Sequence, residues 1–283
     1  MLHLRHGSLR VDLLDPTSEA SRLGPRFCAG GYVWQVHDDT VGPLLSGPEG
    51  PEPEPDPFNG HGLPESFRDR SRSGAPLLWN DAGTEALAPG AGTLVRRDGA
   101  VVIGEPCVWH IAMTPTTAEF RTEHAAAGYA CALTRRISLQ ERTLVSFSAL
   151  TNRADRPMHL QWFAHPFFAL DAERTTSAIL PRGSRVPPDF GFSIDADATL
   201  RPDRAHTGKD DGAFALLELP PDLPLDARIA HPGLPHGIRF STTFVPSECP
   251  VWVNGFTVSI EPYQVLHLAP GESVDWELRY TFG

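Results

Sequence analysis

The sequence predicts an all-β protein built as a large antiparallel β-sandwich or barrel. Short apolar or alternating segments recur along the 283 residues and are separated by Pro, Gly, Asn and Asp, a spacing typical of strands joined by turns. Long segments with helical periodicity are scarce. The 28 prolines and 25 glycines fit a chain that is rich in turns and loops.

The expected strands follow one another along most of the chain. They lie within residues 31–38, 107–114, 117–124, 129–139, 143–151, 159–168, 212–219, 237–244, 249–256 and 276–282. The segment EHAAAGYACAL (123–133) could also be interpreted as a short helix. It lies between strand-like segments, however, so we expect strands there too.

Residues 47–62, GPEGPEPEPDPFNGHG, interrupt this pattern with a run of prolines and acidic residues that cannot easily form regular structure. The segment could link two domains. The chain before it is too short to bury a core of its own, and strand-like segments continue after it in the same style. We therefore expect residues 1–283 to form a single domain, with residues 47–62 as an ordered loop at the mouth of a cleft.

Composition argues against several classes of partner. The formal net charge of −11 is unsuited to binding nucleic acid, and no run of about 18 apolar residues suggests a membrane span. The N-terminal residues MLHLRHGSLRVDLL lack the apolar stretch of a secretory signal. The four cysteines, Cys28, Cys107, Cys131 and Cys249, show no metal-ligand spacing. We expect free thiols, no metal site and a cytoplasmic protein.

His165 stands in an aromatic, strand-like run, FAHPFFALD (163–171), directly before a proline. It could be a core histidine, a metal ligand or a proton donor. Because a residue before proline is extended, His165 is expected at a strand end. Side chains alternate along a strand, so Gln161 and Phe163 should share its face, while Trp162 and Ala164 point the other way.

Glu261 occupies a similar position near the C-terminus. It follows the alternating segment TVSI (257–260) and precedes Pro262, so a carboxylate is expected where a strand ends. Such a residue is well placed to face a cleft, although many glutamates are simply solvated surface residues.

These segments together resemble the galactose mutarotase (aldose 1-epimerase) superfamily. The resemblance rests on the G-x-R-F stretch that begins at Gly24, on Asn152 and Pro157 followed by HPFF (165–168), and on SIEPYQ (259–264) followed by L-x-P-G-E. It covers the C-terminal two-thirds of the chain well and the first third loosely. It implies the large β-sandwich of that superfamily, with a sugar cleft on the concave face of one sheet.

The resemblance also implies a reaction. Mutarotation opens a cyclic sugar by removing a proton from the anomeric hydroxyl and protonating the ring oxygen, and it needs no cofactor. By resemblance Glu261 is the base and His165 the acid. Their expected arrangement is on opposite sides of one hexose-sized pocket.

Further sugar-binding residues follow from the same resemblance. Asn59 and His61 lie in a histidine–glycine turn similar to the family's, although the Asn-Arg-Ile signature before it is missing, and Arg68 follows in RDRSR. Asp211 precedes a strand where the family places an acidic sugar ligand. Gln161 joins this set because it should share the face of His165. A solvated charged loop and a turn-forming Asp-Asp-Gly are equally simple explanations for Arg68 and Asp211.

Tryptophans offer further candidates for the sugar cleft. Trp79, Trp109 and Trp162 could stack on sugar faces, but tryptophans in a sandwich are more often core residues.

Three functions remain open at this point, all with a small-molecule sugar as partner. The first is an aldose 1-epimerase-like mutarotase. The second is a sugar-binding or regulatory protein that has the same sandwich without turnover. The third is a sugar-phosphate mutarotase, in which arginines near Arg68 and Arg72 hold the phosphate.

Overall fold

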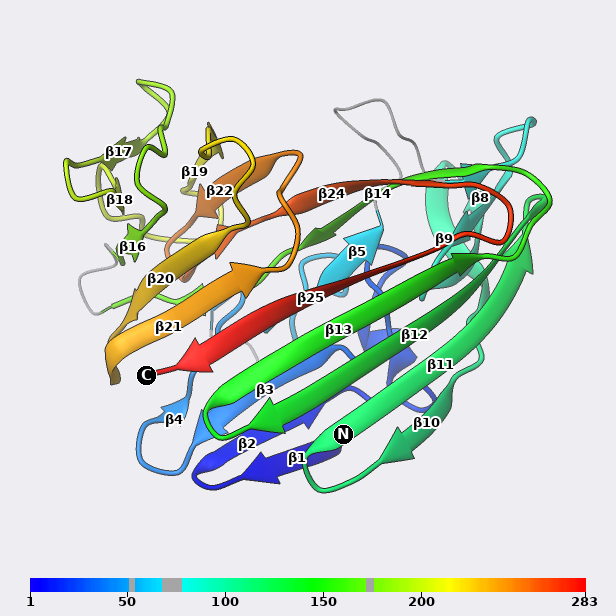
Figure 1. The fold of residues 1–283 in the computed structure, drawn as a ribbon, viewed down its shortest axis with the longest axis horizontal. Coiled ribbons are helices and arrows are strands. Elements are labelled where there is room, and N and C mark those ends of the chain that lie inside the picture. The colour runs from blue at the N-terminus through cyan, green and yellow to red at the C-terminus, as the bar shows by residue number, and fades with distance from the viewer. Residues whose placement is uncertain (51–53, 68–77, 172–175) are drawn as a thin grey trace.

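The computed structural model describes residues 1–50, 54–67, 78–171 and 176–283 and consists almost entirely of antiparallel strands. Its largest element is a ten-stranded sheet that spans the front of the molecule (Figure 1). In spatial order its strands are β10 (His110–Met113), β11 (Thr117–Ala126), β12 (Tyr129–Gln140), β13 (Thr143–Asn152), β25 (Ser273–Phe282), β21 (Leu234–Thr242), β20 (Asp226–His231), β16 (Ala178–Ile179), β18 (Thr199–Pro202) and β17 (Phe192–Ile194). The predicted all-β class is confirmed.

Two smaller sheets form a second layer behind it (Figure 1). One contains β24 (Tyr263–Leu268), β14 (Met158–Ala164) and β5 (Glu65–Phe67); the other contains β15 (Phe168–Ala169), β23 (Thr257–Ile260), β22 (Cys249–Val253) and β19 (Ala213–Leu217). The layers meet through aromatic side chains. Trp162 of β14 packs on Trp276 of β25, with ring centroids 5.1 Å apart. The protein is therefore a β-sandwich, as expected.

The N-terminal third adds two four-stranded sheets. One comprises β1 (Leu2–His6), β2 (Leu9–Leu13), β3 (Val33–Asp38) and β4 (Gly42–Pro43); the other comprises β6 (Leu78–Trp79), β7 (Glu85–Ala88), β8 (Gly92–Arg97) and β9 (Ala100–Pro106). The only helix among the described residues is the short 3₁₀ helix η1 (Ala20–Arg22). No helix in the described part of the chain is long and apolar enough to cross a membrane.

The segment 123–133 lies in the expected strands, and the structure shows that these form a hairpin between β11 and β12. Ala127 and Gly128 occupy its two turn positions with φ of 57° and 77°. Positive φ at both central residues is the mark of a type I′ turn, whose twist matches that of the flanking strands. The helix that alanine-rich composition could suggest is thus excluded by the turn geometry.

Strand β14 shows the alternation that its sequence predicts. Leu160, Trp162 and Ala164 are fully buried and belong to the main core, whereas Phe163 faces the opposite side and lines a cavity. Trp109 is also a core residue, and Trp79 packs partly buried against the core. The preference for core over sugar contact therefore fits all three tryptophans considered from the sequence.

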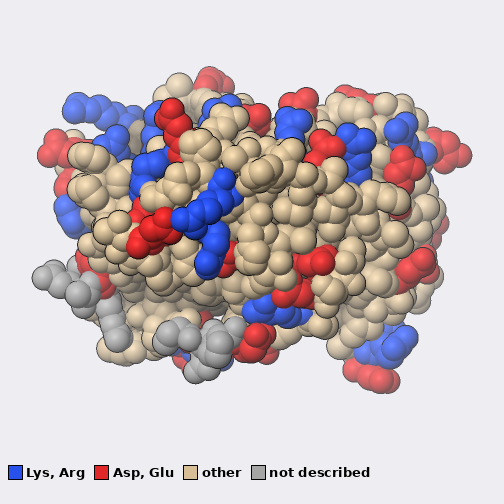
Figure 2. Space-filling view, turned by 90° about the horizontal axis from the view of Figure 1, so that it is seen from below, with Lys and Arg blue, Asp and Glu red and all other residues tan. Residues whose placement is uncertain are grey.

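Charged side chains are mixed on the face of the molecule seen in Figure 2, where Lys and Arg lie among Asp and Glu. Such a distribution does not concentrate positive potential on that face. Phosphate backbones are bound by concentrated cations, so this face offers little to a nucleic acid.

Candidate functional site

A cavity of about 710 Å³ lies against the second layer, at the ends of strands β14 and β23. Its wall is largely aromatic and includes Phe58, Phe163, Phe167, Phe214, Trp252 and Tyr263. Phe163 and Tyr263 sit opposite each other on neighbouring strands and stack with ring centroids 4.6 Å apart. A cavity of this size with flat apolar walls suits a compact ring-shaped ligand.

His165 is held in the cavity wall by the backbone on both sides of it. Its N–H donates to the carbonyl of Pro64 at 2.9 Å, and the N–H of Phe167 donates to the carbonyl of Gly62 at 2.8 Å. Pro166 between them fixes one backbone angle. The imidazole is only 8% exposed. These contacts explain why the chain leaves β14 with the His165 side chain directed at the cavity.

The ring nitrogens of His165 contact side chains. Nδ1 lies 2.9 Å from Oγ of the buried Ser259, and Nε2 lies 3.4 Å from Oε1 of Glu261. Because Ser259 engages Nδ1, the ring is oriented with Nε2 toward the cavity carboxylate. A core histidine satisfied only by backbone groups would not have these partners.

Glu261 is positioned by the residues around the end of β23. Its N–H donates to the carbonyl of Pro250 at 2.8 Å, and its Oε2 accepts a hydrogen bond from the Tyr263 hydroxyl at 3.2 Å. The carboxylate is 5% exposed and lines the same cavity as His165. Its second oxygen, Oε1, is the one that faces the histidine.

The structure differs from the expected placement of these two groups on opposite sides of a pocket. They lie next to each other on one wall, 3.4 Å apart. The expected placement on opposite sides is therefore wrong, because strands β14 and β23 end beside each other and bring both side chains to the same wall. The separation also exceeds the usual N–H···O range of about 2.7–3.2 Å, so the pair is not closed by a tight hydrogen bond.

Solved structures show the same architecture. A galactose mutarotase-like protein from Lactobacillus casei aligns over 100% of both chains with a TM-score of 0.62 and 13% identity. A galactose mutarotase related enzyme from Lactobacillus acidophilus aligns over 100% of this chain and 97% of its own, with a TM-score of 0.60 and 14% identity. This chain has the galactose mutarotase-like fold.

A third similar structure, a proposed aldose 1-epimerase from Escherichia coli, covers 99% of this chain and 98% of its own at 16% identity and a TM-score of 0.56. No protein-family model matches the sequence, and no curated protein matches it significantly. The likeness is therefore one of fold, and the chemistry has to be argued from the residues in the cavity.

The 47–62 segment supplies part of the cavity wall in this galactose mutarotase-like fold. Pro48, Phe58 and Asn59 all line the cavity. The Asn59 amide donates to Oε1 of Glu49 at 3.0 Å, and Lys209 forms an ion pair with the same oxygen at 2.8 Å. Among the expected sugar-binding residues that the structure describes, Asn59 is thus the one that lines the cavity together with His165 and Glu261.

Arg26 is a cavity residue that the sequence did not single out. It is the only Arg or Lys among the described residues of the wall. Its Nη1 donates to the carbonyl of Phe58 at 3.1 Å, and its guanidinium lies 4.9 Å from the centre of the Phe58 ring. Arg26 belongs to the G-x-R-F stretch that supported the resemblance. The arginine of this motif could therefore have been chosen as a candidate from the sequence, but the stretch was interpreted only as part of a hairpin.

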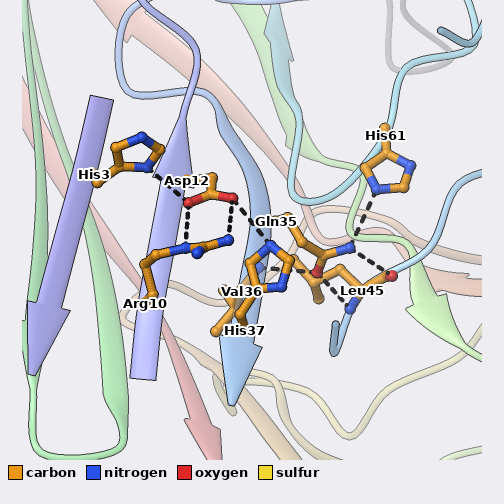
Figure 3. Close-up of polar contacts among 8 residues, drawn as sticks. All are labelled: His3, Arg10, Asp12, Gln35, Val36, His37, Leu45 and His61. Atoms are coloured by element: carbon orange, nitrogen blue, oxygen red, sulfur yellow. Dashed lines mark hydrogen bonds and ion pairs between the residues drawn. The ribbon is translucent and has the colours of Figure 1, made fainter. Parts of the chain in front are cut away.

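His61 is not one of the residues that line the cavity. Its Nε2 is 3.4 Å from Nε2 of Gln35 (Figure 3). Its ring packs on Trp34 with centroids 4.9 Å apart. Burial, aided by the nearby positive charge of Arg22, lowers the pKa of His61 to about 4. His61 is consequently neutral near pH 7 and contributes to an aromatic cluster with Trp34 and Tyr32.

Two of the remaining expected ligands, Gln161 and Asp211, also lie away from the wall. Gln161 is fully buried, with Nε2 3.5 Å from Glu248. Asp211 pairs with Arg204, whose hydrogen bond holds the pKa of that carboxyl far below its usual range. Arg68 and Arg72 fall outside the described residues. The alternation rule placed Gln161 on the correct face of β14, but the chain around Glu248 covers it.

Trp252 and Phe214 are further cavity residues that sequence reasoning missed. They face each other in register on β22 and β19. The Trp252 ring lies 6.1 Å from the His165 ring in an edge-on arrangement. Along their strands, both residues alternate with residues of the main core. This alternation shows that Trp252 and Phe214 point away from the core, but it does not predict that a cavity lies on that side.

Proposed function

We propose that this protein is an aldose 1-epimerase-like mutarotase, which interconverts the anomers of a small-molecule sugar. The observation that carries the proposal is the pairing of the Glu261 carboxylate with the His165 imidazole, 3.4 Å apart on the wall of an aromatic cavity. The galactose mutarotase-like fold adds support, because the similar structures carry mutarotase or aldose 1-epimerase names. Fold alone would not be sufficient.

In the proposed mechanism Glu261 accepts the proton of the anomeric hydroxyl while His165 donates a proton from Nε2 to the ring oxygen. The ring opens and the bond between the first two carbons rotates. As the ring closes on the other face, His165 takes back the proton from the ring oxygen and Glu261 returns its proton to the anomeric oxygen. Ser259 holds Nδ1 of the imidazole, so Nε2 remains the nitrogen directed at the substrate. The reaction is redox-neutral and needs no cofactor.

The aromatic wall would hold the sugar during this exchange. Sugar rings have apolar faces of C–H groups that pack on flat aromatic side chains, and Trp252, Phe163 and Tyr263 offer such surfaces around the acid–base pair. Arg26 and Asn59 supply hydrogen bonds at the wall for hydroxyl groups. The cavity of about 710 Å³ has room for a hexose or a related aldose. Its lining residues do not identify a particular sugar.

The test is polarimetry on freshly dissolved α-glucose and α-galactose with the wild-type protein and the Glu261→Gln variant. The amide cannot accept the anomeric proton, so the variant should lose enzymatic mutarotation while keeping its circular dichroism spectrum. Glu277→Gln, on β25 and outside the cavity, is the matched control and should retain full activity. Normal turnover by Glu261→Gln would remove Glu261 from the mechanism.

The same assay separates the two alternatives. Calorimetric sugar binding without turnover by the wild-type protein would favour a sugar-binding protein. A strong preference for hexose phosphates would favour a sugar-phosphate mutarotase. In that case the Arg26 guanidinium at the cavity wall would bind the phosphate. Substitution of Arg26 by Gln should then reduce the preference for the phosphorylated sugar.

We also infer that residues 1–283 form one domain in a reducing cytoplasm. In support, the main core includes residues from Leu4 to Phe282, and all four cysteines are unpaired and buried. Limited proteolysis within residues 47–62 should not release independently folded fragments. Two stable fragments would show that the segment is a linker between domains.

A further inference from the structure

Two exposed histidines face each other across strands β14 and β24. His159 and His267 are direct cross-strand partners, and their Nδ1 atoms are 2.5 Å apart with ring centroids at 4.8 Å. The separation is shorter than the usual range for N–H hydrogen bonds, about 2.7–3.2 Å. The two nitrogens therefore face each other directly across the strand pair, as the donor and acceptor of one short contact at the surface.

The pair lies on the same sheet face as the proposed active site. Along β14, His159 is followed two residues at a time by Gln161, Phe163 and His165, and side chains at such spacing share a face. Opposite them on β24, His267 is followed in space by Val265 and Tyr263. The histidine pair thus lies at one end of the paired strands β14 and β24. His165 follows the other end of β14.

Two imidazole nitrogens held this close can share a transition-metal ion once the rings turn so that both nitrogens point at it. Histidine is the commonest protein ligand for such ions, and imidazole suits zinc, copper and nickel. Metal–nitrogen bonds of about 2.0–2.1 Å at a right angle or a tetrahedral angle need nitrogens about 3 Å apart. A small rotation of two exposed side chains from their 2.5 Å separation would meet this requirement.

A second group of histidines provides a useful contrast (Figure 3). His3 and His37 both contact the carboxylate of Asp12, at 2.8 and 3.0 Å, which at first resembles a richer ligand set. However, the Arg10 guanidinium also binds that carboxylate, at 2.9 Å. Its positive charge occupies the place of a cation and would repel one. Among the described residues, no Arg or Lys side chain forms an ion pair or hydrogen bond with His159 or His267.

We propose that His159 and His267 form a two-histidine site for a divalent transition-metal ion such as Zn²⁺ or Ni²⁺, with water completing the coordination. Bound metal would clamp β14 to β24 and so fix the spacing of the strands that hold the cavity wall. Because a metal that binds only the folded state stabilises it by mass action, the clamp has a readout that does not depend on sugar turnover.

The experiment is isothermal titration of untagged protein with ZnCl₂ and with NiCl₂, together with thermal unfolding at each metal concentration. One ion per chain should bind, and the melting temperature should rise with metal. Binding should weaken as pH falls, because protons compete with the metal for the nitrogens. His159→Ala and His267→Ala should each abolish both the binding and the rise in melting temperature.

His3→Ala is the matched control, since it removes an exposed histidine from the contrasting group and should leave metal binding unchanged. Circular dichroism without metal establishes that each variant is folded, and His159→Asn provides a second variant that keeps a polar side chain. Absence of metal binding in the wild-type protein would overturn the proposal, as would equal binding by His159→Ala. Loss of binding only in His3→Ala would assign the metal to the other group.

Discussion

Two buried acid–base pairs in this protein are built in different ways. In the core, the Arg135 guanidinium on β12 binds the Glu65 carboxylate on β5 through two contacts of 2.7 Å. Ser146 donates to the same carboxylate at 2.6 Å. At the cavity, His165 and Glu261 approach each other through one contact of 3.4 Å. Each of the four side chains is buried, so burial alone does not distinguish the pairs.

The difference lies in where the two pairs are placed. Both oxygens of Glu65 are held by short contacts in the core, as a buried charge requires. Glu261 and His165 line the cavity, and their contact of 3.4 Å is longer. We call the core pair closed and the cavity pair open. The closed pair joins the two layers of the sandwich, whereas the open pair lies where a ligand in the cavity would reach it.

The largest effect is expected from breaking the open pair. His165→Asn should reduce the rate of mutarotation by about 10² to 10⁴-fold, typical of losing a general acid, with little loss of sugar affinity. Polarimetry and calorimetry measure the two quantities. An unchanged rate would mean that another group protonates the ring oxygen.

Breaking the closed pair should cost stability instead. Arg135→Met leaves Glu65 buried without its partner and should lower the free energy of unfolding by about 3–5 kcal/mol, as measured by urea denaturation. The double variant Arg135→Met/Glu65→Gln should recover part of the loss, because no unpaired charge remains. A small effect of the single variant would show that the core tolerates the lone carboxylate.

The half-buried His61 provides a pH-dependent test, because no carboxylate contacts it among the described residues. Its pKa is about 4 in the folded protein against an ordinary 6.5, so between these values the unfolded chain binds more protons. The free energy of unfolding should therefore fall as pH decreases from about 6.5 to 4, by at most about 3 kcal/mol from this group. His61→Phe should flatten that slope in urea denaturation across the same pH range. An identical slope in both proteins would assign the pH dependence elsewhere.

The smallest effect is expected at an exposed pair. Lys209 and Glu49 lie 2.8 Å apart at the cavity loops, where water and salt screen their attraction. Lys209→Gln should leave the urea midpoint and the rate of mutarotation essentially unchanged. A clear change in the Michaelis constant for the sugar would show that this contact positions the 47–62 loop at the cavity.

The sequence by itself determined the all-β class, the strands within residues 123–133 and the burial of Trp162, because propensity and alternation depend on neighbouring residues. The turn at Ala127 and Gly128 was seen only in the structure. It also pointed to His165 and Glu261, each at the end of a strand before a proline. Their shared role as a proton-transfer pair stays a proposal, as does the role of Asn59.

Only the tertiary structure decided which of these side chains meet. It placed His165 against Glu261, brought Arg26 and Trp252 to the cavity, and left His61 in a separate aromatic cluster. Alternation along a strand assigns a residue to a face, but the segments that cover that face come from elsewhere in the chain. Gln161 shows the limit, since it lies on the predicted face and is still fully buried. Contacts between residues far apart in sequence depend on how whole sheets pack, which no local pattern encodes.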